Sequence, residues 1–277
     1  MIEKKDGIEN SRFHTKVVVM GGGLGKRLES ITGGVIPKDF VEIDPDRHIR
    51  GIDNTQAALE DSSLTDIIYS GSRHLPLYQK ELSKKNITYH FQDETFGHGK
   101  ELMTIINEHG MNSQYLVLPT DIYFKSSDLE ILLQQHKPGT VSWGVTLNSY
   151  PEMEAYKNLV VRKDSFAIIC KTHSRFYPLV KNDPRTELVY NTVMIIFDPV
   201  VFKHAYDLWT RLERPSGSVD LYRDIGIILA EENRRGIQRG RESFLNAIQF
   251  LHPVMDYGTI PSLMALRASF QKNENTL

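Results

Sequence analysis

The sequence predicts an α/β fold, in which a mixed and mostly parallel β-sheet is flanked by helices. Short β-branched runs alternate with helical patterns along most of the chain, and this alternation is typical of βαβ units. A cluster of glycines follows the first β-branched run directly, as in turns that lead from a strand to a ligand-binding loop. The 277 residues are 40% apolar and 25% charged, which are ordinary globular proportions.

The first half of the chain predicts strands that alternate with helices. Leu102, Ile105 and Ile106 have the i, i+3, i+4 spacing of one buried helical face. The expected strands cover residues 16–20, 65–70, 87–92 and 115–118, and the expected helices cover residues 74–84 and 97–109. This order predicts the crossover connections of a parallel sheet.

Strand patterns dominate the middle of the chain, and helices close it. Ser127 and Glu130 have the spacing of a capping box, so we expect a helix there that ends at Lys137-Pro138-Gly139. Further strands are expected at residues 140–147, 158–162, 166–170 and 189–197, and further helices near 199–212, near 219–232 and from Pro261 onward. Because no linker or repeat interrupts this pattern, we expect residues 14–277 to form one domain and the polar residues 1–13 to form a flexible extension.

Composition excludes several classes of protein. Lys and Arg number 33 and Asp and Glu number 35, so the net charge is −2 and there is no basic footprint for nucleic acid. No apolar run approaches the roughly 20 residues that span a bilayer, and the polar start has no signal-peptide stretch. The single cysteine, Cys170, allows no intrachain disulfide. We therefore expect a cytoplasmic protein with no membrane partner.

The glycine loop from Gly21 to Leu28 fits neither of two common phosphate motifs. A P-loop would need Gly where Met20 stands and Ser or Thr where Arg27 stands, and a dinucleotide fingerprint would need Gly where Lys26 stands. A loop then runs from Glu29 to Pro37-Lys38. A triphosphate held by this loop would meet two cations, Arg27 and Lys38, from one segment.

Several motifs resemble those of the sugar-phosphate nucleotidylyltransferases, also called nucleoside-diphosphate-sugar pyrophosphorylases. The loop resembles the signature A-G-G-x-G-T-R-L … P-K of that family, and five later segments follow in the family's order. These segments are Thr95-Phe96-Gly97-His98-Gly99-Lys100-Glu101-Leu102, Leu116-Val117-Leu118-Pro119-Thr120-Asp121, Cys170-Lys171-Thr172, Tyr190-Asn191-Thr192-Val193-Met194 and Asp256-Tyr257-Gly258-Thr259.

The resemblance implies a Rossmann-like fold of the nucleotide-diphospho-sugar transferase type, and the chain shows no repeats for the C-terminal β-helix that some relatives carry. It also implies a reaction, in which a sugar 1-phosphate attacks the α-phosphorus of a nucleoside triphosphate and releases pyrophosphate. The partners would be these two substrates, and a homo-oligomer is compatible with the sequence.

The resemblance assigns roles to individual residues. Arg27, Lys38 and Lys171 would be the catalytic cations, because this chemistry needs charge neutralisation more than acid–base groups. Asp121 and Asp256 would hold Mg²⁺, a hard cation that prefers oxygen ligands. The nucleotide would be bound by Gly21, Gly22, Gly23, Gly25, Lys26, Gln92, Gly97 and Asp121, and the sugar by Asn191 and Cys170.

The sequence departs from the family motifs at Lys26, at His98 and, above all, at Cys170, which replaces a sugar-binding Glu. Two alternatives therefore stay open. One is a non-catalytic regulatory protein that binds nucleotide sugars, and the other is nucleotidyl transfer to a non-sugar phosphate. The motifs fix neither the base nor the sugar.

Overall fold

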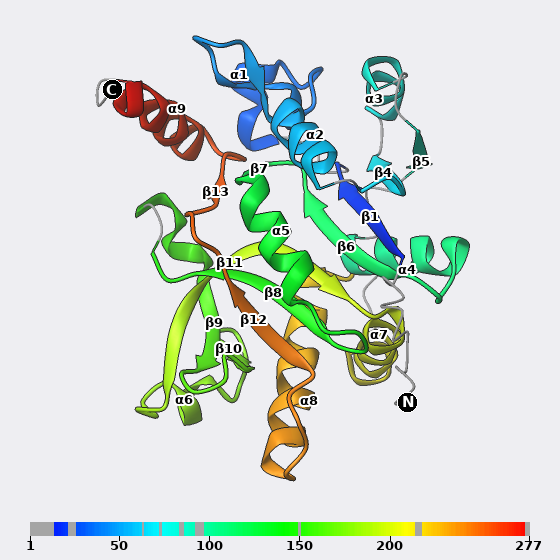
Figure 1. The fold of residues 1–277 in the computed structure, drawn as a ribbon, viewed down its shortest axis with the longest axis vertical. Helices are drawn as coiled ribbons and strands as arrows, with labels where there is room; N and C mark the ends of the chain where they lie inside the picture. Colours follow the sequence, from blue (N-terminus) through cyan, green and yellow to red (C-terminus); the bar gives the residue numbers. More distant parts are fainter. Residues whose placement is uncertain are drawn as a thin grey trace, which may run out of the picture.

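A nine-stranded mixed sheet forms the centre of the molecule (Figure 1). The structure is a computed structural model that describes residues 14–21, 26–62, 64–71, 74–82, 86–91, 97–148, 151–213 and 218–274. The strand order is β10-β9-β11-β6-β1-β4-β5, and β8 pairs with both β11 and β12. The predicted flexible extension, residues 1–13, lies outside the described residues.

The half of the sheet around β1 is parallel, and the half around β11 is largely antiparallel. Strand β1 pairs in parallel with β4 and β6, and β4 pairs in parallel with β5. The long strand β11 pairs antiparallel with β6, β8 and β9. The strands of this sheet are β1 (Thr15–Met20), β4 (Ile67–Gly71), β5 (Ile87–Phe91), β6 (Gln114–Pro119), β8 (Val141–Thr146), β9 (Lys157–Arg162), β10 (Ile168–Lys171), β11 (Thr186–Phe197) and β12 (Leu245–Gln249).

Helices cover both faces of this sheet, as the sequence predicts. Val17 and Val19 of β1 pack toward one face, and Val18 and Met20 pack toward the other, because strand side chains alternate. The first face is covered by α2 (Gly51–Asp61), α3 (Leu75–Glu81) and α5 (Ser126–Gln135), and the second by α4 (Gly97–His109), α7 (Pro199–Glu213) and α8 (Gly226–Gln238). The predicted α/β fold with helices on a mixed sheet is confirmed.

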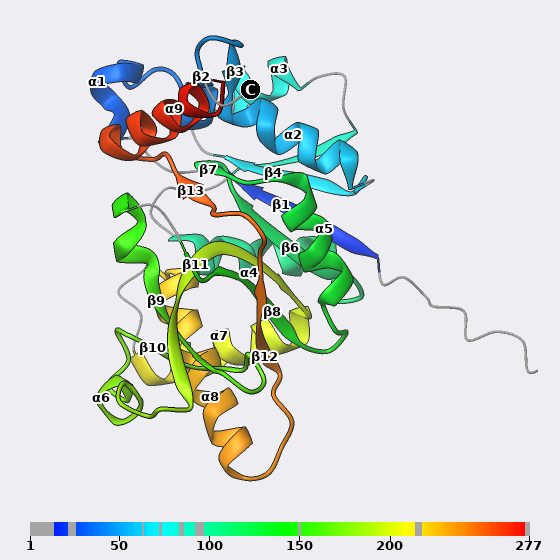
Figure 2. The same cartoon turned by 60° about the vertical axis from the view of Figure 1, so that its left-hand side comes forward.

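A smaller layer lies at the end of the sheet toward which β1 points (Figure 2). Here an apolar cluster joins Leu28, Ile43, Met255, Tyr257 and Leu263. The layer contains α1 (Glu29–Thr32), β2 (Glu42–Asp44), β3 (Ile49–Arg50), β7 (Ile122–Tyr123), β13 (Met255–Asp256) and α9 (Ile260–Glu274), with short 3-10 helices at Lys26–Leu28 and Lys38–Phe40. This layer covers the carboxyl ends of β1 and β6, where open α/β sheets bind ligands.

Three local predictions need correction. The helix α5 begins at Ser126 after Lys125, with no side-chain cap, so the predicted capping box is wrong. Asp128 is instead buried and accepts hydrogen bonds from the backbone of Leu251 (2.8 Å) and His252 (3.4 Å). The loop expected after Glu29 contains the helical turn α1, and a π-helical turn (Leu221–Ile225) precedes α8 in the predicted helix near 219–232.

The remaining helical elements are short. They are α6 (Tyr177–Val180) and a 3-10 helix at Pro151–Tyr156. Within the described part of the chain, no helix is long and apolar enough to cross a bilayer.

Candidate active site

Two carboxylates that are far apart in the sequence meet beyond the end of β6. Asp121 follows β6 by two residues, and Asp256 lies in β13, which pairs antiparallel with β7 so that Asp256 faces Ile122. The backbone N–H of Tyr257 donates to the carbonyl of Asp121 at 2.9 Å and fixes this pairing. A methyl group placed on Gly258 would lie 2.6 Å from Asp121 Oδ2 and 2.8 Å from Asp256 Oδ1, so both carboxylates face the same point.

Two cations of residues 21–38, the glycine-loop segment, reach the same point. The Lys38 ammonium pairs with Asp121 Oδ2, and Arg27 Nη2 lies 3.9 Å from that oxygen. Lys38 is largely buried, whereas the side chain of Arg27 is 61% exposed and free to meet a substrate. The structure therefore brings together Arg27, Lys38, Asp121 and Asp256.

The two carboxylates differ in their proton affinity because their surroundings differ. Burial alone would raise the pKa of Asp121, but the charges of Lys38 and Arg27 outweigh it and lower the pKa. The pKa of Asp256 is raised by burial and by the negative charge of Asp121, although the Tyr156 hydroxyl donates to its carboxylate. Two acidic groups held this close oppose the ionisation of each other, and the cations beside Asp121 keep it the more acidic of the two.

A buried hydrogen bond fixes the end of the glycine-loop segment. The Tyr78 hydroxyl donates to Asp39 Oδ1 at 2.6 Å, directly after Lys38 in the chain. A methyl group on Gly21 would lie 2.9 Å from that hydroxyl oxygen, so only glycine permits the approach. Burial raises the pKa of Asp39 to about 7, against the opposing effect of the Tyr78 hydrogen bond. Gly21 therefore packs against the Tyr78 hydroxyl, whose hydrogen bond to Asp39 holds the neighbouring residue Lys38 in place.

A second cluster, around Lys171, lies at the end of β10. Lys171 is buried, and its ammonium lies 4.7 Å from the centre of the Trp143 ring. Trp143 Nε1 donates to Asn191 Oδ1 at 2.6 Å, and the N–H of Val193 donates to the same oxygen at 2.7 Å. Burial lowers the pKa of Lys171 to about 7, and the charge of Asp220 opposes the shift only partly. Lys171 is therefore an amine whose charged form burial disfavours, and an anionic group beside it would stabilise that form.

Cys170 does not lie with these side chains. Residues directly opposite each other in an antiparallel pair share a face, and Lys171 pairs with Leu159, whereas Cys170 pairs with Val160. A bulge between Ile168 and Cys170 turns Cys170 into a separate apolar cluster with Val160. The thiol is buried there, so the structure does not bring it to Asn191, the other residue predicted to bind sugar.

His98, Asp220 and Tyr222 link the two clusters. The Tyr222 ring lies edge-on to His98, with 6.4 Å between ring centres, and 6.0 Å from the Trp143 ring. Burial raises the pKa of Tyr222, and so do the charges of Asp220 and Asp121. The Tyr222 hydroxyl is buried and has no hydrogen-bond partner in the described part of the chain.

Sequence reasoning noticed His98 only as a departure from a motif, and it missed Asp220, Tyr222, Trp143 and Tyr156 altogether. No short motif marks these positions. The sequence predicts only a helix near 219–232, and in the structure Asp220 precedes a π-helical turn that contains Tyr222.

Other predicted nucleotide-binding residues are only partly placed. Gly97 has a positive φ of 71°, and a methyl group on it would lie 2.6 Å from Ser218 Oγ, so it packs against the segment that leads to Asp220. Gly22, Gly23, Gly25 and Gln92 lie outside the described residues, as does the side chain of Lys26, whose backbone begins a 3-10 helix.

The described residues also limit the kinds of metal site. They contain no group of three or more His, Cys, Asp or Glu side chains that could hold a metal ion on its own. A metal at the two carboxylates would therefore need ligands from substrate or water, which is the usual situation for Mg²⁺.

The family model for nucleotidyl transferases matches residues 16–171, which are more than half of the chain. The chain therefore belongs to the nucleotidyl transferase family, and its class of activity is nucleotidyl transfer. The matched region contains Arg27, Lys38, Asp121 and Lys171.

Solved structures of similar fold cover nearly the whole chain. A putative glucose-1-phosphate thymidylyltransferase from Bacillus anthracis is 19% identical, with a TM-score of 0.64 over 92% of this chain and 94% of that chain. The inositol-1-phosphate CTP transferase from T. maritima is 13% identical, with a TM-score of 0.66 over 94% and 97%. HddC from Yersinia pseudotuberculosis, complexed with GMP-PN, is 17% identical, with a TM-score of 0.63 over 92% and 99%. No curated protein matches the sequence at a significant level.

Proposed function

We propose that this enzyme transfers a nucleoside monophosphate from a nucleoside triphosphate to a sugar 1-phosphate and releases pyrophosphate. The observation that carries the proposal is the convergence of Asp121, Asp256, Arg27 and Lys38 on one point, with Lys171 in a second cluster linked to it through Tyr222 and Asp220. The clusters match the two needs of the reaction, a site for the departing phosphates and a site for the attacking phosphate.

The triphosphate would lie against the glycine-loop segment. Arg27 is exposed, and its planar guanidinium can hold two phosphate oxygens, whereas the buried Lys38 offers a point charge. Both charges would stabilise pyrophosphate as it leaves. We expect Lys38 to exchange its contact with Asp121 for a phosphate oxygen when substrate binds.

The donor set around Gly258 fits Mg²⁺. Asp121 and Asp256 present oxygen atoms to one point, and burial together with the charge of Asp121 raises the pKa of Asp256, so a cation there would favour its ionised form. Bound Mg²⁺ would neutralise phosphate oxygens near the reacting phosphorus. The Tyr156 hydroxyl, which donates to Asp256, would orient that carboxylate.

The acceptor phosphate would bind at Lys171. The buried ammonium has Trp143 on one side, and Gly226 packs closely against both side chains: a methyl group there would lie 3.0 Å from Trp143 and 3.3 Å from Lys171 Cδ. The attacking oxygen is already anionic, so Lys171 has to position it and neutralise charge rather than accept a proton. The Tyr222 hydroxyl, which has no hydrogen-bond partner among the described residues, can donate to the same phosphate.

A second candidate is transfer to a non-sugar phosphate such as a polyol phosphate. Cys170, in place of the family's Glu, is turned to the far face of β10, so no carboxylate of this segment meets acceptor hydroxyls beside Lys171. Asp220 is the nearby carboxylate that could take over this contact. The T. maritima structure, whose title names an inositol-1-phosphate CTP transferase, has the same fold.

The test is a substrate screen with Mg²⁺, in which each of the five common nucleoside triphosphates is combined with sugar 1-phosphates or inositol 1-phosphate and pyrophosphate release is measured. We expect release only when triphosphate and acceptor are both present, and the preferred acceptor separates the two enzymatic candidates. Binding of a nucleotide sugar without pyrophosphate release from any pair would favour the regulatory alternative.

Variants of the carboxylates sharpen the screen. Asp121→Asn and Asp256→Asn should each reduce turnover by at least about a hundredfold, and the double variant should be little worse, because groups that act as a unit are not additive. Asp207→Asn is the matched control, since Asp207 pairs with Lys203 on the surface of α7. Losses that multiply in the double variant would contradict a shared cation.

A further inference from the structure

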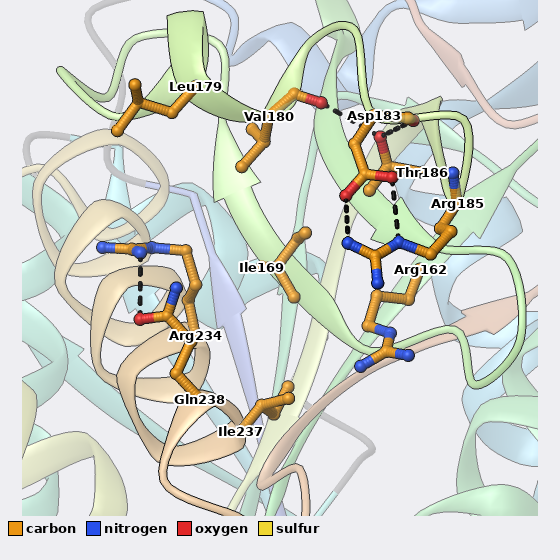
Figure 3. Close-up of a pocket in the computed structure, with 10 residues that line it drawn as sticks. All are labelled: Arg162, Ile169, Leu179, Val180, Asp183, Arg185, Thr186, Arg234, Ile237 and Gln238. Carbon is orange, nitrogen blue, oxygen red and sulfur yellow. Dashed lines mark hydrogen bonds and ion pairs between the residues drawn. The ribbon is translucent and has the colours of Figure 1, made fainter.

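A cavity of about 270 Å³ lies beside β10 and is lined by Ile169 of that strand (Figure 3). Its walls come from β9, β10, α6 and the end of α8, and Ile169, Val180 and Ile237 form an apolar floor. Leu179 lines it as well and is 75% exposed. The volume is slightly below the usual range of about 300–1,000 Å³ for ligand pockets, so a ligand would be small.

Three arginines line this cavity from two sides. In Figure 3, Arg234 lies on one side of Ile169, and Arg162 and Arg185 lie on the other. Arg185 forms a two-pronged contact with Asp183, with Nε and Nη2 at 3.0 and 2.8 Å from its carboxylate oxygens. Arg162 similarly contacts Asp164.

Arg234 differs from the other two because no carboxylate pairs with it among the described residues. Its guanidinium lies 4.4 Å from the centre of the Phe176 ring, and Nη1 donates to Gln238 Oε1 at 3.2 Å. Its Nε is buried and has no hydrogen-bond partner in the described part of the chain. A buried N–H of a charged group that lacks an acceptor is unfavourable, and an oxyanion is the acceptor that a guanidinium binds best.

We propose that this cavity binds a small organic anion, whose carboxylate or phosphate group meets the arginines and whose apolar body covers Ile169, Val180 and Ile237. Asp164 and Asp183 pair with Arg162 and Arg185, and the charge of Arg234 is left in excess, so the site favours negative charge. The apolar floor favours a molecule with a carbon body over an inorganic ion.

The cavity is separate from the proposed binding site of the substrate phosphates, but β10 and α8 border both of them. Ile169 lies two residues before Lys171 in β10. Arg234, Ile237 and Gln238 belong to α8, and Gly226 at the start of that helix packs against Lys171. An anion that binds there and shifts β10 or α8 should therefore alter turnover without competing with the triphosphate. This effect on turnover rests on the proposed function, whereas binding of the anion does not.

The binding test uses phenyl phosphate, benzoate, inorganic phosphate and benzyl alcohol as probes, with calorimetry on the full chain. We expect saturable binding of phenyl phosphate or benzoate, with inorganic phosphate and benzyl alcohol each at least tenfold weaker. Arg234→Gln should weaken the aromatic anions at least tenfold, and the neighbouring Arg235→Gln should not, since Arg235 pairs with Glu232 and does not line the cavity.

Two further variants keep the test decisive. Leu179→Glu places a negative charge at an exposed position of the cavity and should also weaken the anions, whereas Leu212→Glu on α7 should not. Arg27→Ala should leave this binding intact. Binding that is lost in Arg27→Ala but kept in Arg234→Gln would place the probes at the substrate site and overturn the proposal, as would the absence of saturable binding.

Kinetics then test the link to Lys171. The anion that binds should change the maximal rate in wild type at saturating triphosphate, and the effect should vanish in Arg234→Gln. Binding with no change in rate would refute the link through β10 and α8, and it would leave the proposed nucleotidyl transfer untouched.

Discussion

The buried amine of Lys171 predicts that acceptor binding takes up a proton above neutral pH. Its pKa falls from 10.5 to about 7 because the ammonium is buried with only partial compensation from Asp220. A phosphate dianion at this position would supply the missing counter-charge and raise the pKa again. Each pKa unit corresponds to about 1.4 kcal/mol, so the free protein disfavours the charged form by roughly 5 kcal/mol.

The pH dependence follows from this difference. At pH 8 about nine in ten molecules of free protein would hold Lys171 as a neutral amine, so binding would take up about 0.9 proton. Acceptor affinity should therefore fall about tenfold for each pH unit above 7, and it should level off below 7 as far as this group is concerned. Between pH 7.5 and 9 the acceptor phosphate stays a dianion and does not contribute to the slope.

Calorimetry in buffers with different ionisation enthalpies measures the proton uptake directly. The titrant is the acceptor that gives the highest rate in the substrate screen. Lys171→Met should abolish the uptake and most of the affinity, whereas Lys203→Met, at an exposed position on α7, should change neither. An uptake near zero at pH 8 in wild type, with affinity independent of pH, would refute the reasoning.

Two other substitutions test the support of the site. Asp39→Asn should raise the free energy of unfolding at pH 8 relative to wild type by up to about 4 kcal/mol, and by less than half as much at pH 5. The sign follows because the folded protein keeps the Asp39 proton up to pH about 7, while the unfolded chain loses it near 3.8, so wild-type stability falls as pH rises through this window. Urea unfolding at the two pH values measures the gain in stability, and a gain that is equal at both would contradict the prediction. Gly258→Ala should lower turnover at least tenfold in steady-state assays, because its methyl group would lie 2.6 Å from Asp121 Oδ2 and 2.8 Å from Asp256 Oδ1; an unchanged rate would show that these oxygens do not serve the reaction.

Much of the fold could be predicted because the core strands carry a local signal. The alternation of Val17, Val18 and Val19 between two helical layers follows from the period of a strand, and the bounds of α4 agree with the predicted helix 97–109. The helix α2 was not predicted. Few of its residues are apolar. At its start the backbone N–H and the guanidinium of Arg50 both donate to the Asp53 carboxylate, and Arg at this position does not match the usual capping pattern.

The candidate site could be predicted in part, through motif order rather than through geometry. Only the antiparallel pairing of β7 with β13 brings Asp256 to Asp121, and no local pattern shows which strands pair. Cys170 illustrates the limit most clearly. Its neighbour Lys171 lies in the cluster with Trp143, but a bulge in β10 decides which face each side chain takes, and sequence spacing does not reveal a bulge.

The central claim is that one site joins a nucleotide to a phosphate acceptor with release of pyrophosphate. Phosphorus-31 NMR of a mixture of protein, Mg²⁺, the preferred triphosphate and the preferred acceptor tests it most directly. We expect pyrophosphate and a diphosphate diester to appear at equal rates while both substrates disappear, and we expect Asp121→Asn to stop all four changes together. Release of phosphate or pyrophosphate without a diphosphate diester, or diester formation that continues in Asp121→Asn, would contradict it.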